Sequence, residues 1–211
     1  MVIYRAIKGF LLYVIIPWIR AEAVGVERLN QPGPLILAPV HRSNLDSVVL
    51  PAFSSRRIRA LAKDSLFGIP VLGYVVSALG AIPVRRGESD RDALVAAKDL
   101  LARGEAMIVF PEGGRQSGPD VKELFTGTAW LSAKSGAPVV PIGIAGTEEA
   151  LPFGSRFLKR SRVRIVIGEP LAPPVARDGR RIGRDELRAF TADLRERLQA
   201  AQDEANALRR S

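Results

Sequence analysis

Short apolar runs alternate with helical segments along most of this chain, and this alternation limits the fold more than any other feature. The run LILAPV at residues 35–40 is continuously apolar and has the length of a strand. Strands that alternate with helices are typical of an α/β fold with a largely parallel sheet. The sequence therefore predicts the α/β fold class: a single layered domain with a mixed, largely parallel sheet flanked by helices.

The other predicted elements continue this pattern. A helix is expected at residues 88–103, where an acidic start and apolar spacing precede Gly104, and the alternation at 56–63 indicates an exposed strand. No linker or composition break appears, so residues 1–211 are predicted to form one domain with its core at 20–171. The remaining predicted strands are at 21–26, 81–84, 105–110, 137–146 and 162–171, and the remaining helices at 1–19, 46–53, 124–136 and 184–210.

Residues 66–84 form an uncharged stretch close to the length of a membrane span. Glycines and prolines interrupt it, which favours a helix followed by a short strand at 81–84. A span here would place residues 41–46 and 110–116 on opposite sides of a membrane. Because those two stretches are expected to form one site, the segment is predicted not to cross.

The N-terminal segment, residues 1–19, is predicted to be a helix that lies in a membrane interface. Its apolar run is too short to span a bilayer, and Tyr13 and Trp18 suit the headgroup level. Two alternatives stay open. One is a cleaved signal peptide, since the AEA at residues 21–23 resembles a cleavage site. The other is a helix packed on the protein's own core.

The charge of the chain favours anionic partners. Lys and Arg number 31 against 22 Asp and Glu, a net charge of +9, which suits phosphate groups, nucleic acid or an acidic membrane surface. Aromatic residues make up only 6% of the chain and no nucleic-acid-binding motif occurs, so nucleic acid is not expected as a partner. The chain has no cysteine, which excludes disulfides, thiolate catalysis and cysteine-ligated metals.

The segment VHRSNLD contains the one histidine of the sequence, His41, and a carboxylate five positions later, Asp46. Imidazole accepts a proton near pH 7, and a carboxylate on its second ring nitrogen fixes the tautomer and stabilises the imidazolium. The segment leads from a strand end into a helix, so both side chains are expected to face one cavity. The alternative is a structural histidine beside an aspartate that caps the helix.

Two further stretches carry groups that suit a phosphate-bearing ligand. The segment FPEGGR, residues 110–115, leaves a strand through a glycine-rich loop, whose N–H groups can approach an anion closely. Glu112 is suited to accept from a substrate hydroxyl, and Arg115 to pair with phosphate. The segment GAIPVRRG, residues 80–87, places two arginines at a strand end. An ordinary turn and two solvated arginines are the alternative interpretations.

In this order, HRSNLD, GAIPVRR, FPEGGR and APVVPIGI resemble the four sequence blocks of the PlsC-type lysophospholipid and glycerol-phosphate acyltransferases. The resemblance runs over residues 20–171, and its last block, residues 139–144, matches family residues near the acyl chain. It implies an enzyme that moves a fatty acyl group from acyl-CoA or acyl carrier protein to a hydroxyl of lysophosphatidic acid, giving phosphatidic acid. It implies no metal, and no cofactor beyond the acyl thioester.

The resemblance also implies a role for each matching residue. His41 would be the general base that deprotonates the glycerol hydroxyl, and Asp46 would orient it and stabilise its charge. Arg86 would bind the phosphate of the acceptor. Glu112 and Gly113 would contact the glycerol-phosphate part of the acceptor.

The match departs from the family pattern at the third block. Gly114 and Gln116 replace a frequent Thr and Ser, and residues 124–127 (LFTG) lack the lysine of a frequent F-K-x-G. Lys122 or Arg115 is expected to substitute for that lysine, unless the acceptor is not a simple phosphate monoester.

A basic run at residues 156–164 is expected to face anionic lipid or the phosphates of CoA, with a solvated surface as the alternative. The sequence thus predicts a peripheral or monotopic enzyme on the cytoplasmic face of the cell membrane, with an anionic membrane surface as a partner. Two alternative functions stay open: acylation of a different acceptor, such as a glycolipid or another lysophospholipid, and a catalytically inactive membrane-surface binding protein.

Overall fold

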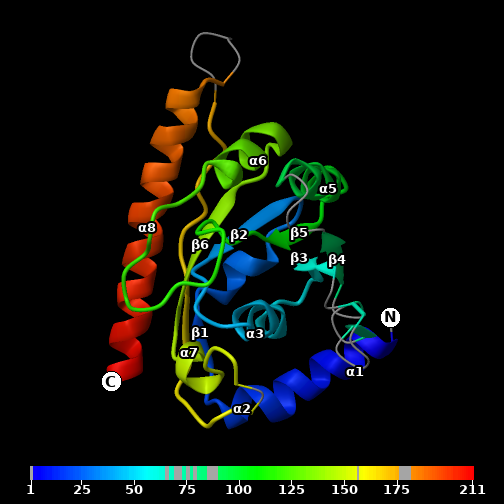
Figure 1. Ribbon diagram of the computed structural model, residues 1–211, viewed down its shortest axis with the longest axis vertical. Coiled ribbons are helices and arrows are strands. Elements are labelled where there is room, and N and C mark those ends of the chain that lie inside the picture. The colour runs from blue at the N-terminus through cyan, green and yellow to red at the C-terminus, as the bar shows by residue number, and fades with distance from the viewer. Residues whose placement is uncertain are drawn as a thin grey trace.

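The computed structural model describes residues 2–64, 67–68, 73–74, 77, 80–84, 90–155, 157–175 and 182–211. The strands within these residues are β1 (Glu22–Val24), β2 (Leu35–Pro39), β3 (Ile58–Lys63), β4 (Ala81–Val84), β5 (Ala106–Ile108), β6 (Val139–Ala145) and β7 (Arg164–Ile167). These seven described strands form one sheet in the order β1-β7-β6-β2-β5-β3-β4 (Figure 1). All neighbours are parallel except β6 and β7, which are antiparallel. The predicted α/β class with a mixed, largely parallel sheet is confirmed.

Helices flank this sheet (Figure 1). Those described are α1 (Val2–Phe10), α2 (Ile16–Trp18), α3 (Asp46–Phe53), α5 (Asp90–Ala102), α6 (Gly127–Ser135), α7 (Thr147–Ala150) and α8 (Arg184–Arg210), with a π-helical turn at Leu11–Ile15 and a 3-10 turn at Val26–Asn30. The chain crosses the sheet in one direction from β2 to β3 and in the other from β4 through β5 to β6. Right-handed crossovers, the rule for parallel strands, therefore place α3 on one face and α5 and α6 on the other. α8 packs against α6 and along β6 and β7.

The central strands form the core. All residues of β2, β5 and β6 are buried, as expected for continuous apolar runs covered on both faces. The prediction of an exposed strand at 56–63 is wrong in one respect, because β3 pairs with β5 on one side and β4 on the other. Its Ile58 is buried, and Arg59 forms an ion pair with Glu105. Because Glu105 pairs with Arg59, this interior strand can carry a charged residue and show the alternating pattern of an exposed strand.

Most other predicted elements are present with small differences in length. α6 begins at Gly127 rather than at residue 124, and α7 has no counterpart among the predicted elements. Gly104 ends α5 with a φ of +75°, a left-handed conformation that glycine adopts without strain. β4 confirms the strand expected at 81–84, while the helix expected before it lies largely outside the described residues.

The N-terminal segment is helical from Val2 to Trp18, which confirms the predicted helix. One side packs on the core through Ile15, Ile16 and Ile19. The other side carries side chains that are 48–83% exposed, namely Phe10, Tyr13, Val14 and Trp18. No helix in the described part of the chain is both long and apolar enough to cross a bilayer. The segment thus fits the packed-helix alternative on one side, while its location in a membrane interface stays a prediction.

α8 joins the sheet through two close contacts with β6. Strand pairing between β2 and β6 ends at Ile142, so the backbone of Ile144 needs other partners on that side. The side-chain amide of Gln202 supplies them, since it accepts from the Ile144 N–H at 2.8 Å and donates to the Ile144 carbonyl at 3.1 Å. Gly143 allows this approach, because a Cβ there would lie 2.2 Å from the carbonyl oxygen of Ala201. The C-terminal helix therefore completes the sheet where β2 leaves it.

Replacing Gly143 with alanine is predicted to destabilise the protein. The added methyl group would overlap the backbone of α8, and relief requires the helix to move off β6. Overpacking of this kind costs about 1–3 kcal/mol, and each kcal/mol lowers the melting temperature of a domain of this size by about 2–4 °C. Thermal unfolding followed by circular dichroism measures the change.

Gly127→Ala is the matched control for this measurement. A Cβ at Gly127 meets only one side-chain atom, at 3.8 Å, so the control should melt within about 2 °C of the unchanged protein. A Gly143→Ala variant as stable as this control would show that the close approach of α8 to β6 does not constrain the fold.

Candidate active site

Two loops meet at the carboxyl edge of the sheet. β2 and β5 are parallel neighbours, with Leu37 opposite Ile108, so the segments that follow them leave the sheet side by side. The first segment carries His41, and the second carries Glu112 and Gln116. The Gln116 N–H donates to the carbonyl oxygen of His41 at 2.8 Å, which ties the two loops together. Motifs that lie about 70 positions apart in the sequence are thus brought to one place.

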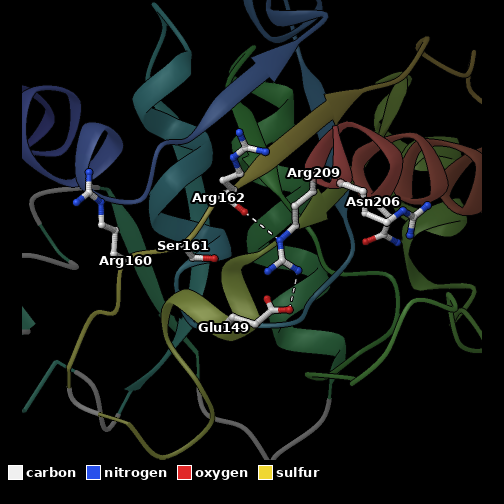
Figure 2. A pocket seen from close by; sticks show the side chains of 7 residues that line it. Glu149, Arg160, Ser161, Arg162, Asn206 and Arg209 are labelled. Carbon is white, nitrogen blue, oxygen red and sulfur yellow. Dashed lines mark hydrogen bonds and ion pairs between the residues drawn. The ribbon is translucent and has the colours of Figure 1, made fainter.

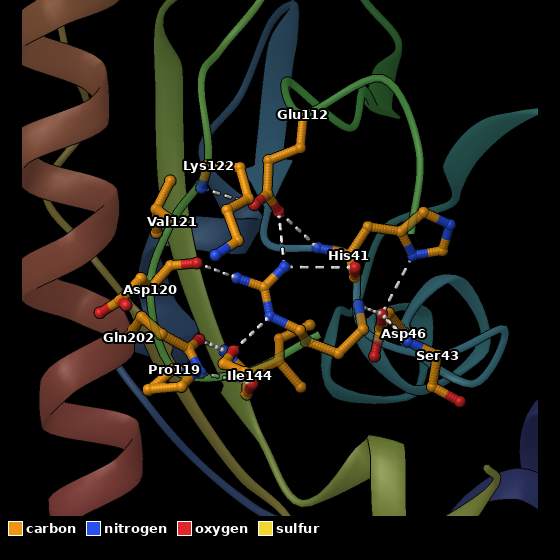
Figure 3. Close-up of polar contacts among 12 residues, drawn as sticks. His41, Ser43, Asp46, Glu112, Pro119, Asp120, Val121, Lys122, Ile144 and Gln202 are labelled. Atoms are coloured by element: carbon orange, nitrogen blue, oxygen red, sulfur yellow. Dashed lines mark hydrogen bonds and ion pairs between the residues drawn. The ribbon is translucent and has the colours of Figure 1, made fainter. Parts of the chain in front are cut away.

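His41 and Asp46 form a hydrogen-bonded pair (Figure 3). The Nδ1 atom of His41 lies 3.1 Å from Oδ2 of Asp46, whose side chain is fully buried. An ionised carboxylate only accepts, so a neutral imidazole in this pair carries its proton on Nδ1 and keeps a lone pair on Nε2. A histidine that acts as a general base requires this arrangement.

Asp46 also holds the backbone of its own loop. The same Oδ2 atom accepts from the N–H groups of Arg42 and Ser43, each at 2.7 Å. These bonds run back to the loop, and no side-chain bond caps the start of α3. The alternative interpretation of this aspartate as a helix cap is therefore not supported.

Phe110 supports the imidazole from one face. The two ring centroids are 3.8 Å apart with an angle of 18° between the planes, which is a stacked arrangement. The His41 side chain is 11% exposed. Stacking on one face and the bond to Asp46 on one edge leave the imidazole little freedom to rotate.

A buried ion pair lies next to the backbone of His41 (Figure 3). Nη1 of Arg42 is 2.8 Å from Oε2 of Glu112, and their side chains are 3% and 0% exposed. Arg42 also donates to the carbonyl oxygens of Gly118 and Asp120, and Oε1 of Glu112 accepts from the Lys122 N–H at 3.0 Å. Buried charges are tolerated when they are paired and hydrogen-bonded in this way.

The ion pair also binds the main chain of His41 on both sides. Oε2 of Glu112 accepts from the His41 N–H at 3.1 Å, and Nη1 of Arg42 donates to the His41 carbonyl oxygen at 3.3 Å. The backbone of His41 is thus fixed by Arg42 and Glu112, whereas its ring is fixed by Asp46 and Phe110.

The predicted residues of the FPEGGR loop point in different directions. The carboxylate of Glu112 is directed into the protein, while Gly113 and Arg115 are exposed. Gly113 has a φ of +70° and lies against the ring of Phe125, where a Cβ would come within 2.6 Å of a ring carbon. The Arg115 guanidinium lies over the ring of Phe153, 4.3 Å from its centroid. A substrate can therefore reach Gly113 and Arg115 directly, but not the Glu112 carboxylate in this conformation.

Arg86, the predicted phosphate ligand, lies outside the described residues, so its role stays a prediction. Lys122 is described and exposed. Among the residues that the structure describes, no group of three or more His, Cys, Asp or Glu side chains is placed to hold a metal ion.

Arg42 and Phe110 belong to the site but were not identified from the sequence. Arg42 occupies one of the four positions between His41 and Asp46, which the motif treats as a spacer. A signal was available, since Arg42 and Glu112 are opposite charges in two motifs expected to meet. The motif does not reveal that both side chains are buried, and it is their burial that requires the two charges to be paired.

Comparisons with known proteins agree with this geometry. An acyltransferase family model matches residues 20–145, which include His41, Asp46 and Glu112. A chloroplastic 1-acyl-sn-glycerol-3-phosphate acyltransferase of Brassica napus is 33% identical over 165 residues, which are 74% of this chain and 46% of that protein. The chain thus spans slightly less than half the length of this plant relative.

Two bacterial proteins match over more of their length. The 1-acyl-sn-glycerol-3-phosphate acyltransferase of Bacillus subtilis is 26% identical over 183 residues, 86% of this chain and 88% of that protein. The crystal structure of the 1-acyl-sn-glycerophosphate acyltransferase PlsC from Thermotoga maritima superposes with a TM-score of 0.70 at 25% identity, covering 93% of this chain and 78% of that one. With the four sequence blocks and the geometry of His41 and Asp46, these matches show that the chain belongs to the PlsC-type acyltransferase family.

Proposed function

We propose that this protein transfers a fatty acyl group from acyl-CoA or acyl carrier protein to a hydroxyl of lysophosphatidic acid, giving phosphatidic acid. The observation that carries the proposal is the Asp46–His41 pair at the carboxyl edge of the sheet, in which Nδ1 is bonded and Nε2 is left to take a proton. The names of the relatives from Bacillus, Brassica and Thermotoga support the same acceptor.

His41 acts as the general base of this reaction. Its Nε2 takes the hydroxyl proton while the hydroxyl oxygen bonds to the carbonyl carbon of the thioester. The C–S bond then breaks, and the imidazolium returns the proton to the leaving sulfur. Asp46 stabilises the imidazolium between these two steps. A thioester is already activated, so holding the two substrates together and moving one proton are sufficient without a covalent acyl-enzyme.

Arg42 and Glu112 serve as positioning residues in this proposal. Both Glu112 oxygens already accept from protein donors, and its side chain is 0% exposed, which supports a role in holding His41. Contact with the acceptor, the role that the family resemblance implies for Glu112, is better suited to the exposed Gly113 and Arg115. Arg86 binds the phosphate of the acceptor in this proposal, because it matches the phosphate-binding arginine of the family.

A different acceptor is the second candidate, and one observation favours it. Residues 124–127 lack the family's lysine, and the exposed ring of Phe125 stands beside Gly113. An apolar side chain at this place suits an acceptor with less charge than a phosphate monoester.

The proposal also places the protein on the cytoplasmic face of the cell membrane as a peripheral or monotopic protein. The exposed aromatic side chains of the N-terminal helix support this location, since such rings prefer the membrane–water interface. The net charge of +9 favours an anionic membrane surface.

Removing the base is predicted to abolish acceptor-dependent thiol release. The assay supplies palmitoyl-CoA or palmitoyl-acyl carrier protein as the donor, together with vesicles, with or without lysophosphatidic acid. It compares the unchanged protein with His41→Ala and Asp46→Asn. Both variants should lose about 10²–10⁴-fold in rate, because one removes the proton acceptor and the other the charge that orients it. Monoacylglycerol and lysophosphatidylcholine, offered in place of lysophosphatidic acid, identify the acceptor.

Each outcome of this assay has a distinct meaning. Release that needs lysophosphatidic acid and is lost in His41→Ala supports the proposal. Faster release with another acceptor supports the second candidate. A near-normal rate in His41→Ala overturns the mechanism, and no release from either thioester donor with any acceptor leaves the inactive binding protein as the function.

Glu112→Gln is predicted to lower kcat while leaving the KM for the acceptor within about twofold. The reason is that the Glu112 carboxylate holds the backbone of His41, the proposed base, and does not itself bind substrate. A large rise in KM with kcat unchanged would assign Glu112 to acceptor contact instead. Glu123→Gln, an exposed change on the neighbouring segment, is the matched control and should alter neither constant.

Arg86→Ala is predicted to raise the KM for lysophosphatidic acid by about 10-fold or more and to change the KM for the acyl donor little, because a bidentate contact to phosphate is lost. Steady-state rates over a range of each substrate measure the two constants. Equal rises in both would argue against an acceptor-specific role.

A further inference from the structure

A polar cavity whose lining does not include the His41 site lies between the loop that precedes β7 and the end of α8 (Figure 2). It has a volume of about 640 Å³. The described residues that line it include four arginines and one carboxylate, namely Arg160, Arg162, Arg209, Arg210 and Glu149. The sequence shows the first two arginines and the last two as separate basic segments, and the fold brings them together.

One arginine of this cavity, Arg209, is held in place before any ligand arrives. Arg209 donates from Nε to the carbonyl oxygen of Arg162 at 3.1 Å and from Nη1 to Glu149 at 2.6 Å, which fixes its guanidinium in the cavity wall (Figure 2). Arg160 and Arg210 also line the cavity and are exposed. A single carboxylate does not balance four guanidinium groups, and arginine binds phosphate oxygens in a bidentate manner. The cavity therefore suits a phosphate-bearing anion.

The surroundings of the cavity indicate which kind of phosphate-bearing ligand it binds. The loop that carries Arg160 and Arg162 is joined to the end of the N-terminal helix, since the Val163 N–H donates to the Ile19 carbonyl at 3.2 Å. The last residue of that helix, Trp18, is 50% exposed, and Phe157 on the same loop is 81% exposed. Aromatic side chains beside a cluster of arginines are typical of surfaces that meet both the acyl and the headgroup regions of a bilayer.

We propose that this arginine cavity, lined by Arg160, Arg162, Arg209 and Arg210, binds the phosphate of an anionic phospholipid headgroup. The phosphates of free CoA share the same chemistry, but free CoA does not present the acyl layer of a bilayer, which the exposed Trp18 and Phe157 suit. Binding here is separate from acyl transfer: α7 and the loop after it lie between the cavity and the His41 loop, which contacts them through the Ser43 hydroxyl and the Leu151 carbonyl at 2.8 Å. Headgroup binding rests on the proposed membrane location of the protein, but it holds or fails independently of the proposed acyl transfer.

Co-sedimentation of the full chain with vesicles tests the proposal. One set of vesicles contains phosphatidylcholine alone, and the other adds phosphatidylglycerol. Each basic residue near an anionic surface strengthens binding about fivefold, so Arg160→Gln/Arg210→Gln should weaken binding to the anionic vesicles about 10- to 30-fold. Binding to pure phosphatidylcholine should change less than twofold. The variants replace exposed side chains and leave Arg209 and its two bonds in place.

A matched control separates the cavity from net charge. Arg103→Gln/Arg188→Gln removes the same charge from exposed positions elsewhere. Arg103 directly follows α5, and Arg188 lies near the start of α8, far along the helix from Arg210. This control should bind anionic vesicles within about threefold of the unchanged protein. Glu149→Gln should act in the opposite direction and tighten binding, because it removes the carboxylate and releases the Nη1 group of Arg209.

Three results would overturn the proposal. Equal losses in the test and control pairs would mean that only overall charge matters. No loss in the test pair would mean that the cavity does not meet lipid. Calorimetry with free CoA covers the remaining source of phosphate: CoA binding that the test pair abolishes, with vesicle binding unchanged, would assign the cavity to the acyl donor.

Discussion

The buried ion pair between Arg42 and Glu112 is the interaction on which the site depends. It joins the segment after β2 to the segment after β5, and it binds both backbone groups of His41. An ion pair with both side chains below 4% exposure is costly to break on one side only, because the remaining charge is left without a partner. The same contact that holds the two loops together thus determines the position of the His41 backbone.

Much of the fold was predictable, because the continuous apolar runs of β2 and β6 and the charged helix α8 carry strong local signals. The exceptions have tertiary causes. The sequence of β3 alternates like that of an exposed strand because it contains Arg59, whose charge is paired with Glu105. The two residues come together only when the sheet folds. The one-turn helix α7 is too short to leave a periodic pattern.

The site divides in a similar way. The pairing of His41 with Asp46 was predictable, because five positions that turn from a strand into a helix bring the two side chains together. The direction of Glu112 was not predictable, since a carboxylate in a glycine-rich loop looks available to a ligand until its partner Arg42 is known to be buried. One half of the arginine cavity lies in the basic run at 156–164, which the sequence singles out for anionic lipid or CoA phosphates. The other half, Arg209 and Arg210, was not predictable as its partner, because β7 and most of α8 separate the two in the sequence.

The pairing of β1 with β7 places residue 22 beside residue 164, and α8 must still follow to complete β6 through Gln202. During synthesis on the ribosome, the first strand therefore waits for its neighbour until most of the polypeptide has been made. Contacts so distant in sequence are slow to form, because loop closure must precede any gain from packing. The helix at Val2–Trp18 emerges before β5 and the loop that follows it, so its exposed rings are available to a membrane or a chaperone before the two loops around His41 can meet.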